Sequence, residues 1–308
     1  MNPIRLKPVY KETIWASSRI SDIRGLNNPA VGIAREVCAY HGSENEVLSA
    51  PFDGEKISDV IRAHHDEILG GEPADQLVRV AYMGSAEDLS IQVHPNEEQA
   101  RTVGDYEKSE SWYILEADPG ATIVAGIDPM DKESFTKAAM DGSLEKHLHH
   151  MPVKAGDFVY IPANLVHANG KHMLVLEIGS YGGITYRIYD YGRGRSLDID
   201  KSYAIMNPDL QPALTEHPFR PVHGSEVSTG VDCRLFHVDV IDVEQEYRIP
   251  AEGGCYALTC VSGSCSIGCG NTEESLDYTQ TILIPAACPD LTIHGKCRIL
   301  RSWMKHID

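Results

Sequence analysis

Short runs of β-branched and aromatic residues, separated by glycine, aspartate and proline, dominate the sequence. They lie between residues 77 and 93, 112 and 127, and 153 and 188, and again between residues 235 and 304. Short strands with turn residues at close intervals are typical of jelly rolls and barrels. The dipeptides Ile161-Pro162 and Ile284-Pro285 end strand-like runs in both halves and indicate a duplicated architecture. The sequence therefore predicts a mainly β protein.

Two segments depart from the strand pattern. Residues 55–70 and 131–150 carry apolar side chains at roughly helical spacing, the second with an interruption near Asp141-Gly142, and both are predicted to be helical. At 308 residues with 42% apolar content, the chain can build two moderate cores. The proline-rich stretch from Met206 to Glu226 is predicted to be a linker. We expect an N-terminal domain over residues 1–215 and a C-terminal domain over residues 216–308.

The charge balance limits the partners. There are 27 basic and 45 acidic side chains, and the net charge of −18 would repel nucleic acid and anionic membranes. An anionic substrate would need a local basic pocket. The N-terminus lacks the apolar core of a signal peptide, and no apolar run is long enough to cross a bilayer, so we expect a cytoplasmic protein whose cysteines are reduced thiols.

The segment from Leu89 to Pro95 alternates strictly between apolar and polar residues. On an extended strand Ser90, Gln92 and His94 would share one face, because successive side chains of a strand point to opposite sides. The same parity places Lys108 and Glu110 together on a later strand. Glutamine, histidine and glutamate together indicate a divalent-cation site.

A further histidine follows a short strand with turns at both ends. Gly156-Asp157 can lead into the strand that ends at Ile161, and the turn with Asn164, which tolerates positive φ, can deliver His167. The combined set would suit zinc, manganese or iron. Each residue also has a structural explanation, since a lone histidine is more often hydrogen-bonded within the fold and Glu110 could be a solvated strand residue.

Two arginines lie among aromatic residues between Thr185 and Arg193. In one interpretation Arg187 stacks on a tyrosine or pairs with Asp190 and has no part in chemistry. In the other it stabilises a developing oxyanion.

In order and over most of its length, the chain resembles type I phosphomannose isomerases, bicupin enzymes that interconvert mannose 6-phosphate and fructose 6-phosphate. The segments that carry this resemblance are Leu89-Ser-Ile-Gln-Val-His-Pro95, Lys108-Ser-Glu-Ser-Trp-Tyr-Ile-Leu115, Val153-Lys-Ala-Gly-Asp-Phe-Val-Tyr-Ile-Pro162 with His167, and Thr185-Tyr-Arg-Ile-Tyr-Asp190 with Arg193. Together they are highly specific, although each is weak alone.

The resemblance implies two cupin domains, each a jelly-roll β-sandwich or barrel, with a helical insertion near residues 131–150. It also implies an aldose–ketose isomerase that acts on a sugar phosphate through an enediol with one zinc ion (Zn²⁺) per chain. The implied zinc ligands are Gln92, His94, Glu110 and His167. Ser90 and Lys108 match positions associated with the substrate phosphate, and Arg187 matches the catalytic arginine. Glu177 is a candidate for the proton-transfer base or for a partner that orients a ligand.

The departures from the family pattern lie outside the metal set. They are Trp15-Ala-Ser17 for Trp-Gly-Gly, Gly32-Ile-Ala-Arg-Glu-Val-Cys38 for Gly-Glu-Ser-Trp-Glu-Ile-Ser, Glu107 for glycine, and Gly179-Ser-Tyr-Gly-Gly183 for a more polar stretch. We expect these departures to affect sugar specificity and catalytic efficiency more than metal binding. The second cupin is expected to lack a metal site, and its closely spaced cysteines are expected to be core thiols.

Three alternatives stay open at this point. The chain could be an isomerase-like enzyme that acts on another sugar or sugar phosphate, or a non-catalytic sugar-binding or regulatory cupin. A metal-dependent dioxygenase is a weaker alternative, because such enzymes usually hold iron with histidines and one carboxylate, without glutamine.

Overall fold

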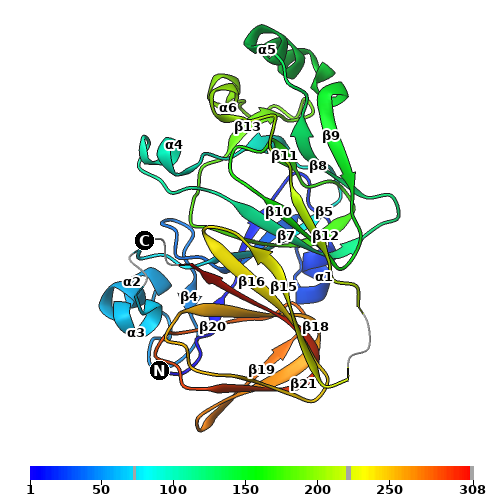
Figure 1. Ribbon diagram of the computed structural model, residues 1–308. Coiled ribbons are helices and arrows are strands. Elements are labelled where there is room, and N and C mark those ends of the chain that lie inside the picture. Colours follow the sequence, from blue (N-terminus) through cyan, green and yellow to red (C-terminus); the bar gives the residue numbers. More distant parts are fainter. Residues whose placement is uncertain (72–73, 220–222, 306–308) are drawn as a thin grey trace. The chain divides into compact units, whose positions relative to one another are not determined.

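The structure is a computed structural model, and it describes residues 1–71, 74–219 and 223–305. The chain divides into two compact units (Figure 1). One unit, which we call the C-terminal unit, contains residues 1–10, 34–81 and 217–308, and the other, the site unit, contains residues 11–33 and 82–216. Three of the points at which the chain passes from one unit to the other lie within strands, namely β2 (Val9–Glu12), β3 (Val31–Val37) and β5 (Arg79–Ser85).

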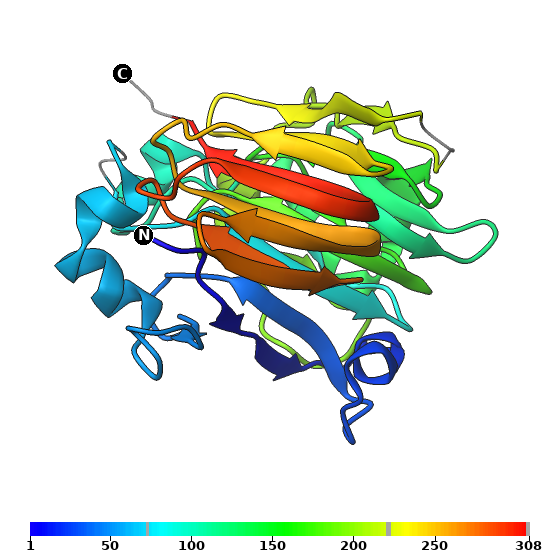
Figure 2. The ribbon, with the colours of Figure 1, turned by 90° about the horizontal axis from the view of Figure 1, so that it is seen from below.

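The C-terminal unit is built on long antiparallel strands that lie side by side in Figure 2, where they run from yellow to red. Their central pair aligns Ile267 with Ile293, and the core contains apolar side chains from both strands. The elements of this unit are β1 (Leu6–Lys7), β4 (Glu46–Val47), α2 (Ile57–Ala63), α3 (His65–Leu69), β15 (Ser225–Asp232), β16 (Phe236–Val243), β17 (Glu246–Ile249), β18 (Tyr256–Cys269), β19 (Thr272–Asp277), β20 (Thr281–Ile284) and β21 (Leu291–Met304).

The site unit contains strands of two sheets, as a jelly roll requires. One sheet has the order β13-β6-β11-β8-β9, and the other has the order β14-β10-β7-β12-β5-β3-β2. The elements are α1 (Arg19–Arg24), β6 (Ile91–Val93), α4 (Glu97–Arg101), β7 (Glu110–Ala117), β8 (Thr122–Ile127), α5 (Lys132–Asp141), the 3₁₀ helix η1 (Ser143–His147), β9 (Leu148–Pro152), β10 (Asp157–Ile161), β11 (His167–Ala168), β12 (Met173–Gly179), β13 (Tyr186–Tyr189), α6 (Ile199–Ile205) and β14 (Ala213–Glu216).

The predicted mainly β fold is confirmed, and the strands β10 and β20 end directly before the two Ile-Pro prolines. The helical predictions need correction. Residues 55–70 form two short helices, because the backbone leaves helical geometry at His64, where φ is −134° and ψ is 41°. In the second segment Gly142 takes a left-handed conformation that ends α5, and residues 148–150 belong to β9, which pairs with β8.

The predicted linker from Met206 to Glu226 is not an unstructured connection. Residues 213–216 form β14, which pairs with β10, and β15 begins at Ser225. Residues 220–222, which include Pro221, lie outside the described residues. A boundary between the compact units falls at residue 216/217, but residues 1–10 and 34–81 group with the C-terminal unit. The division into an N-terminal domain over residues 1–215 and a C-terminal domain over residues 216–308 stays a prediction.

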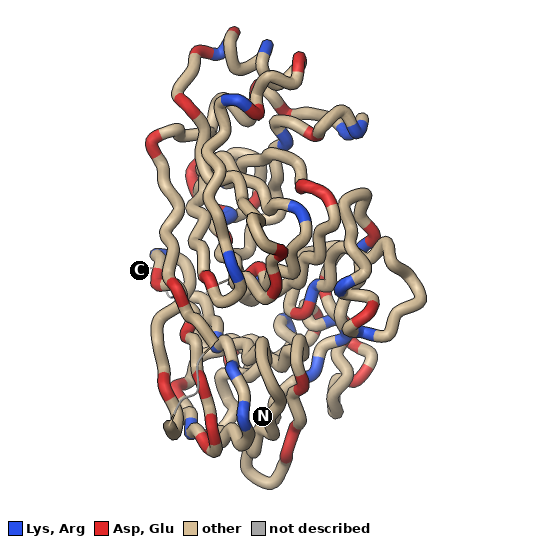
Figure 3. Tube along the Cα trace, turned by 90° about the vertical axis from the view of Figure 1, so that its right-hand side faces the viewer, with Lys and Arg blue, Asp and Glu red and all other residues tan. Residues whose placement is uncertain are grey.

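Most of the late cysteines lie in the core, as the sequence predicts, but Cys233 and Cys255 are only partly buried. The buried cluster of the C-terminal unit contains five of them as free thiols, namely Cys260, Cys265, Cys269, Cys288 and Cys297. Basic and acidic positions are interspersed along the traces of both units (Figure 3). No helix within the described ranges is long and apolar enough to span a membrane.

The backbone after β11 is tightly packed at Gly170. A Cβ atom at this position would lie 1.9 Å from the carbonyl oxygen of Thr122, which is well inside contact distance. The Gly170 carbonyl also accepts a hydrogen bond of 2.7 Å from the Ser85 hydroxyl. The close approach therefore requires glycine.

We predict that Gly170→Ala lowers the free energy of unfolding by about 2–3 kcal/mol, because the added methyl group must displace backbone. Gly268→Ala in β18 is the matched control, since its Cβ would meet only the Thr292 carbonyl oxygen at an ordinary 3.8 Å. Urea unfolding of both variants tests this. Equal stability of the two variants would contradict the packing argument.

Candidate metal centre

Three neighbouring strands of the five-stranded sheet align polar side chains in one row. In the strand register Gln92 of β6 lies opposite His167 of β11 on one side and opposite Arg187 of β13 on the other. Directly opposed residues of antiparallel strands project from the same face. The row therefore presents an imidazole, an amide and a guanidinium to one side of the sheet.

The remaining members of the cluster come from the ends of strands. Glu110 is the first residue of β7 in the other sheet, and His94 directly follows β6. The Nε2 atom of His94 lies 3.2 Å from Nε2 of His167 and 3.1 Å from Oε1 of Glu110. Nε2 of His167 is 3.8 Å from Oε2 of Glu110 and 3.4 Å from the amide nitrogen of Gln92. These four side chains converge on one point, and the two histidines and the glutamate are buried.

Backbone carbonyl oxygens orient both imidazoles. Nδ1 of His94 lies 3.0 Å from the carbonyl oxygen of Ile184, and Nδ1 of His167 lies 2.8 Å from that of Leu165. A carbonyl oxygen can only accept, so each Nδ1 carries the proton and donates it, and each Nε2 is left with a lone pair. Two lone pairs and a carboxylate thus face one another. Such a donor set fits a divalent cation, and the carbonyl contacts are the support that metal-binding histidines usually have.

Burial keeps the ligands in the forms that a metal needs. It lowers the pKa of His94 to about 3, with the Lys108 ammonium acting in the same direction, and it also lowers the pKa of His167. Both imidazoles are therefore neutral near pH 7. Burial alone would raise the pKa of Glu110, but the Lys108 ammonium outweighs it and holds this pKa well below its ordinary value. The carboxylate is ionised.

Lys108 supplies the positive charge nearest to the cluster. It lies two residues before β7, outside the strand on which the sequence pattern placed it. Its Nζ atom is 2.6 Å from Oε1 of Glu110 and donates to Nε2 of His94 over 3.1 Å. Only 11% of the lysine side chain and 2% of the glutamate side chain are exposed. The two residues form a buried ion pair within the cluster.

The loop before His167 is fixed by Asn164. Its φ of 69° lies in the left-handed region that the sequence analysis assigned to this turn. The side-chain amide donates to the carbonyl oxygen of His94 at 3.1 Å and to Oε1 of Gln99 at 2.7 Å. Asn164 thereby ties the loop that carries His167 to the chain around His94.

Arg187 is held beside the cluster. Its Nε donates to the hydroxyl of Ser90 at 3.2 Å, and Nη1 donates to the carbonyl oxygen of Ser196 at 3.1 Å. Among the described residues no ion pair joins Arg187 to Asp190, and the Asp190 carboxylate accepts hydrogen bonds from Arg193 and Arg195 instead. Ser90 and Arg187 are thus paired with each other, and Gln92 links them to the cluster through the strand register.

Two of the departures from the family pattern, Glu107 and the stretch 179–183, have a structural explanation. Glu107 accepts hydrogen bonds from the Ser109 hydroxyl at 2.9 Å and from the backbone N–H of Glu97 at 3.1 Å, which ties the segment before β7 to α4. The stretch 179–183 runs beside this segment, where Gly182 donates from its N–H to the carbonyl oxygen of Glu107 at 3.2 Å. A Cβ at Gly182 would lie 2.5 Å from the Tyr106 carbonyl oxygen, so the approach requires glycine.

The contacts that the backbone provides were not predicted from the sequence. The carbonyl oxygens of Ile184 and Leu165 carry no sequence signal, although they decide which imidazole nitrogen faces the cluster. The role of Ser180, whose hydroxyl accepts from the N–H of Ser109 at 3.0 Å, was not predicted either. The serine in the altered stretch was visible in the sequence, but its partner across the fold was not.

Known proteins resemble this chain over almost its whole length. No protein-family model matches it. Mannose-6-phosphate isomerase ManA of Bacillus subtilis (strain 168) is 31% identical over 312 residues, which cover 97% of this chain and 98% of the relative. The chain belongs to the mannose-6-phosphate isomerase family. The mannose-6-phosphate isomerase of Streptococcus mutans is 26% identical over 310 residues, which cover 97% of this chain and 98% of the relative.

Solved structures show the same relationship. The crystal structure of the mannose 6-phosphate isomerase from Bacillus subtilis matches all of this chain with a TM-score of 0.90 and 27% identity. A zinc-bound mannose 6-phosphate isomerase covers 99% of the chain with a TM-score of 0.78 and 15% identity, which shows the shared fold. The cupin architecture is thus common to the family and to this chain.

We predict strong coupling between Glu110 and Lys108 in chelator-treated protein. Glu110→Gln leaves a buried ammonium unpaired, and Lys108→Met leaves a buried carboxylate, so each change should lower the free energy of unfolding by about 3–5 kcal/mol. The double variant should lose much less than the sum, since it leaves neither charge. Urea unfolding of the three variants measures the coupling, and additive losses would contradict the buried pair.

Proposed function

We propose that this protein interconverts mannose 6-phosphate and fructose 6-phosphate. The observation that carries the proposal is the buried cluster of His94, Glu110 and His167, beside Gln92 and Lys108, in a chain of the mannose-6-phosphate isomerase family. A cluster of neutral imidazoles and an ionised carboxylate supports a metal-dependent reaction. The Lys108 ammonium and the Arg187 guanidinium nearby match an anionic substrate.

We propose that the four converging side chains hold one zinc ion. His94, Glu110 and His167 offer two imidazole nitrogens and a carboxylate, and Gln92 would add its amide oxygen once the amide group turns, which gives a mixed set that suits zinc. When bound, zinc would polarise a sugar oxygen during the isomerisation. A solved relative is described as zinc-bound, which is consistent with this choice.

Arg187 is proposed to stabilise the negative charge that develops on the sugar. Moving a proton between C1 and C2 of an aldose passes through an enediol whose oxygen carries growing negative charge. The guanidinium is fixed by Ser90 and by the Ser196 carbonyl, so it needs little rearrangement to act. Burial and the neighbouring Arg195 lower the pKa of Arg187, but an arginine stays cationic near neutral pH.

Lys108 and Ser90 are proposed to contact the substrate phosphate. The chain as a whole is strongly acidic, so a dianionic group needs local cations. Lys108 is the ammonium next to the cluster, and Arg187 donates to the hydroxyl of Ser90. With a divalent cation bound to Glu110, the carboxylate charge is compensated and the Lys108 ammonium can interact with the phosphate instead. A cytoplasmic location stays a prediction.

We predict that chelation abolishes isomerase activity with mannose 6-phosphate and that added zinc restores it. The purified protein should contain about one zinc ion per chain, and His167→Ala should lose both the metal and the activity, because it removes one of two imidazole ligands. Metal analysis and a coupled assay of fructose 6-phosphate formation measure this. Activity that survives complete metal removal would contradict the proposal.

The same assay with other hexose phosphates and with unphosphorylated mannose separates the main alternatives. Faster turnover of another sugar would identify an isomerase of different specificity. Binding of mannose 6-phosphate without any turnover would identify a sugar-binding cupin that is not an enzyme.

We predict different kinetic effects for the two cations. Lys108→Met should raise KM about tenfold or more with zinc content unchanged, since it removes a phosphate contact. Arg187→Ala should lower kcat by about 10²–10³-fold, since it removes charge stabilisation in the transition state. Arg101→Ala on α4, which removes an exposed arginine paired with Glu97, is the control and should leave both constants unchanged. Equal loss of zinc and activity in Lys108→Met would refute its assignment to the phosphate.

A further inference from the structure

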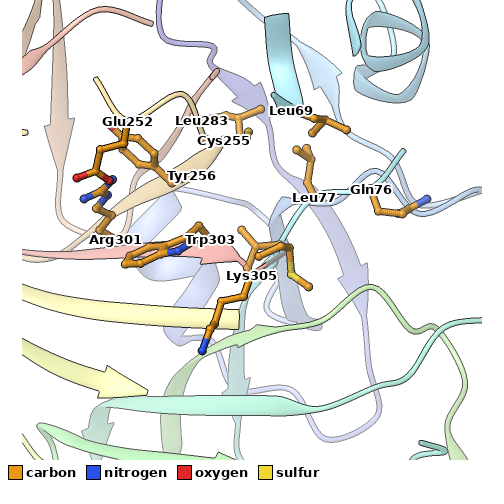
Figure 4. A pocket seen from close by; sticks show the side chains of 13 residues that line it. Leu69, Gln76, Leu77, Glu252, Cys255, Tyr256, Leu283, Arg301, Trp303 and Lys305 are labelled. Atoms are coloured by element: carbon orange, nitrogen blue, oxygen red, sulfur yellow. The ribbon is translucent and has the colours of Figure 1, made fainter. Parts of the chain in front are cut away.

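A pocket lies entirely within the C-terminal unit, whereas the candidate metal centre belongs to the site unit. Its volume is about 370 Å³, which falls in the range of small-molecule sites. Its walls come from the end of α3, the chain before β5, the start of β18 and the end of β21 (Figure 4). The proposed isomerisation uses none of these elements.

Arg301 is the fixed polar group of this pocket. Its guanidinium carbon lies 4.3 Å from the ring centre of Tyr256 and 4.9 Å from that of Trp303, and only 12% of the side chain is exposed. Nη2 donates to Glu252 at 2.6 Å, and Nε makes no hydrogen bond with any described residue. The aromatic contacts hold the planar fork in place, and N–H groups remain for a second acceptor.

The aromatic rings do not offer a free platform for a sugar or a base. The Trp303 ring already stacks on His237, with centroids 4.4 Å apart, and both it and Tyr256 are engaged by Arg301. Figure 4 shows a different surface on the opposite side, where Leu69 and Leu77 line the pocket. Leu283 and Met304 add further apolar lining. This surface favours a compact apolar group.

The charges around the pocket favour a single negative charge on the ligand. Arg301 pairs with Glu252, and Lys305 pairs with Asp232 at 3.0 Å, so the two cations are already balanced. A phosphate dianion would add two charges next to these carboxylates. A monocarboxylate would only replace Glu252, whose side chain is 55% exposed and can turn into solvent at little cost.

We propose that this pocket binds a small monocarboxylic acid with an apolar body. The carboxylate takes the place of Glu252 on the Arg301 fork, and the apolar body packs against the leucines and Met304. Arg301 suits this task because its planar fork matches a carboxylate. The proposal is independent of the isomerase activity, since none of its residues belongs to the metal cluster.

Two acids of this class, 4-methylpentanoate and phenylacetate, serve as probes, and their uncharged amides serve as controls. Isothermal titration of the intact protein should show saturable binding at one site for at least one acid. The acid should bind about tenfold or more tightly than its amide, because only the carboxylate gains charge-assisted hydrogen bonds. No saturable binding of either acid, equal binding of acid and amide, or tighter binding of inorganic phosphate would overturn the proposal.

Two variants change the affinity in opposite directions. Arg301→Gln should weaken acid binding about tenfold or more, whereas Glu252→Gln should tighten it about threefold, because the internal competitor for the fork is gone. Arg248→Gln is the matched control, since Arg248 forms an exposed ion pair with Asp290 in the same unit and does not line the pocket. If Arg301→Gln does not fold, Glu252→Gln still decides, and unchanged or weaker binding in that variant would overturn the proposal.

Discussion

In the candidate metal centre, two imidazole nitrogens and a carboxylate oxygen face one another in a buried space, and their unshared electron pairs repel each other. Two imidazole nitrogens approach within 3.2 Å of each other, and a carboxylate lies as close to one of them. The single N–H of each neutral imidazole is at Nδ1 and donates a hydrogen bond to a carbonyl oxygen. At neutral pH neither ring therefore has a proton at Nε2 to bridge the two nitrogens. A positive charge next to this arrangement stabilises it. The Lys108 ammonium supplies that charge in the structure, and a divalent cation would supply more of it.

Strand register turns distant residues into neighbours. Gln92, His167 and Arg187 lie far apart in the sequence, but they occupy one row across β11, β6 and β13. Glu110 comes from the other sheet at the end of a strand. The row on the sheet fixes the direction in which its side chains point, and the position of Glu110 at a strand end leaves room beside it for a ligand. The fold therefore sets the relative positions of the side chains in the cluster.

Much of this arrangement could be predicted from the sequence. The alternation around Gln92 and the short strand before His167 correctly indicate which side chains share a face, because strand periodicity is a local property. The positive φ of Asn164 is local in the same sense. The roles of the Ile184 and Leu165 carbonyl oxygens could not be predicted, since every residue carries a carbonyl group. The pairing of Asp190 with Arg193 and Arg195 depends on loop geometry, which periodicity does not encode.

Burial decides which of the ion pairs in this protein can exchange a partner with a ligand. In the pair of Lys108 and Glu110 both side chains are enclosed, so either one left alone would carry the full cost of an unsolvated charge. A ligand can enter there only if it brings compensating charge, as a divalent cation does. In the pair of Arg301 and Glu252 the arginine is held by aromatic rings while the carboxylate reaches solvent. An external carboxylate can replace it without leaving a buried charge, so one ion pair is a structural contact and the other is an exchangeable one.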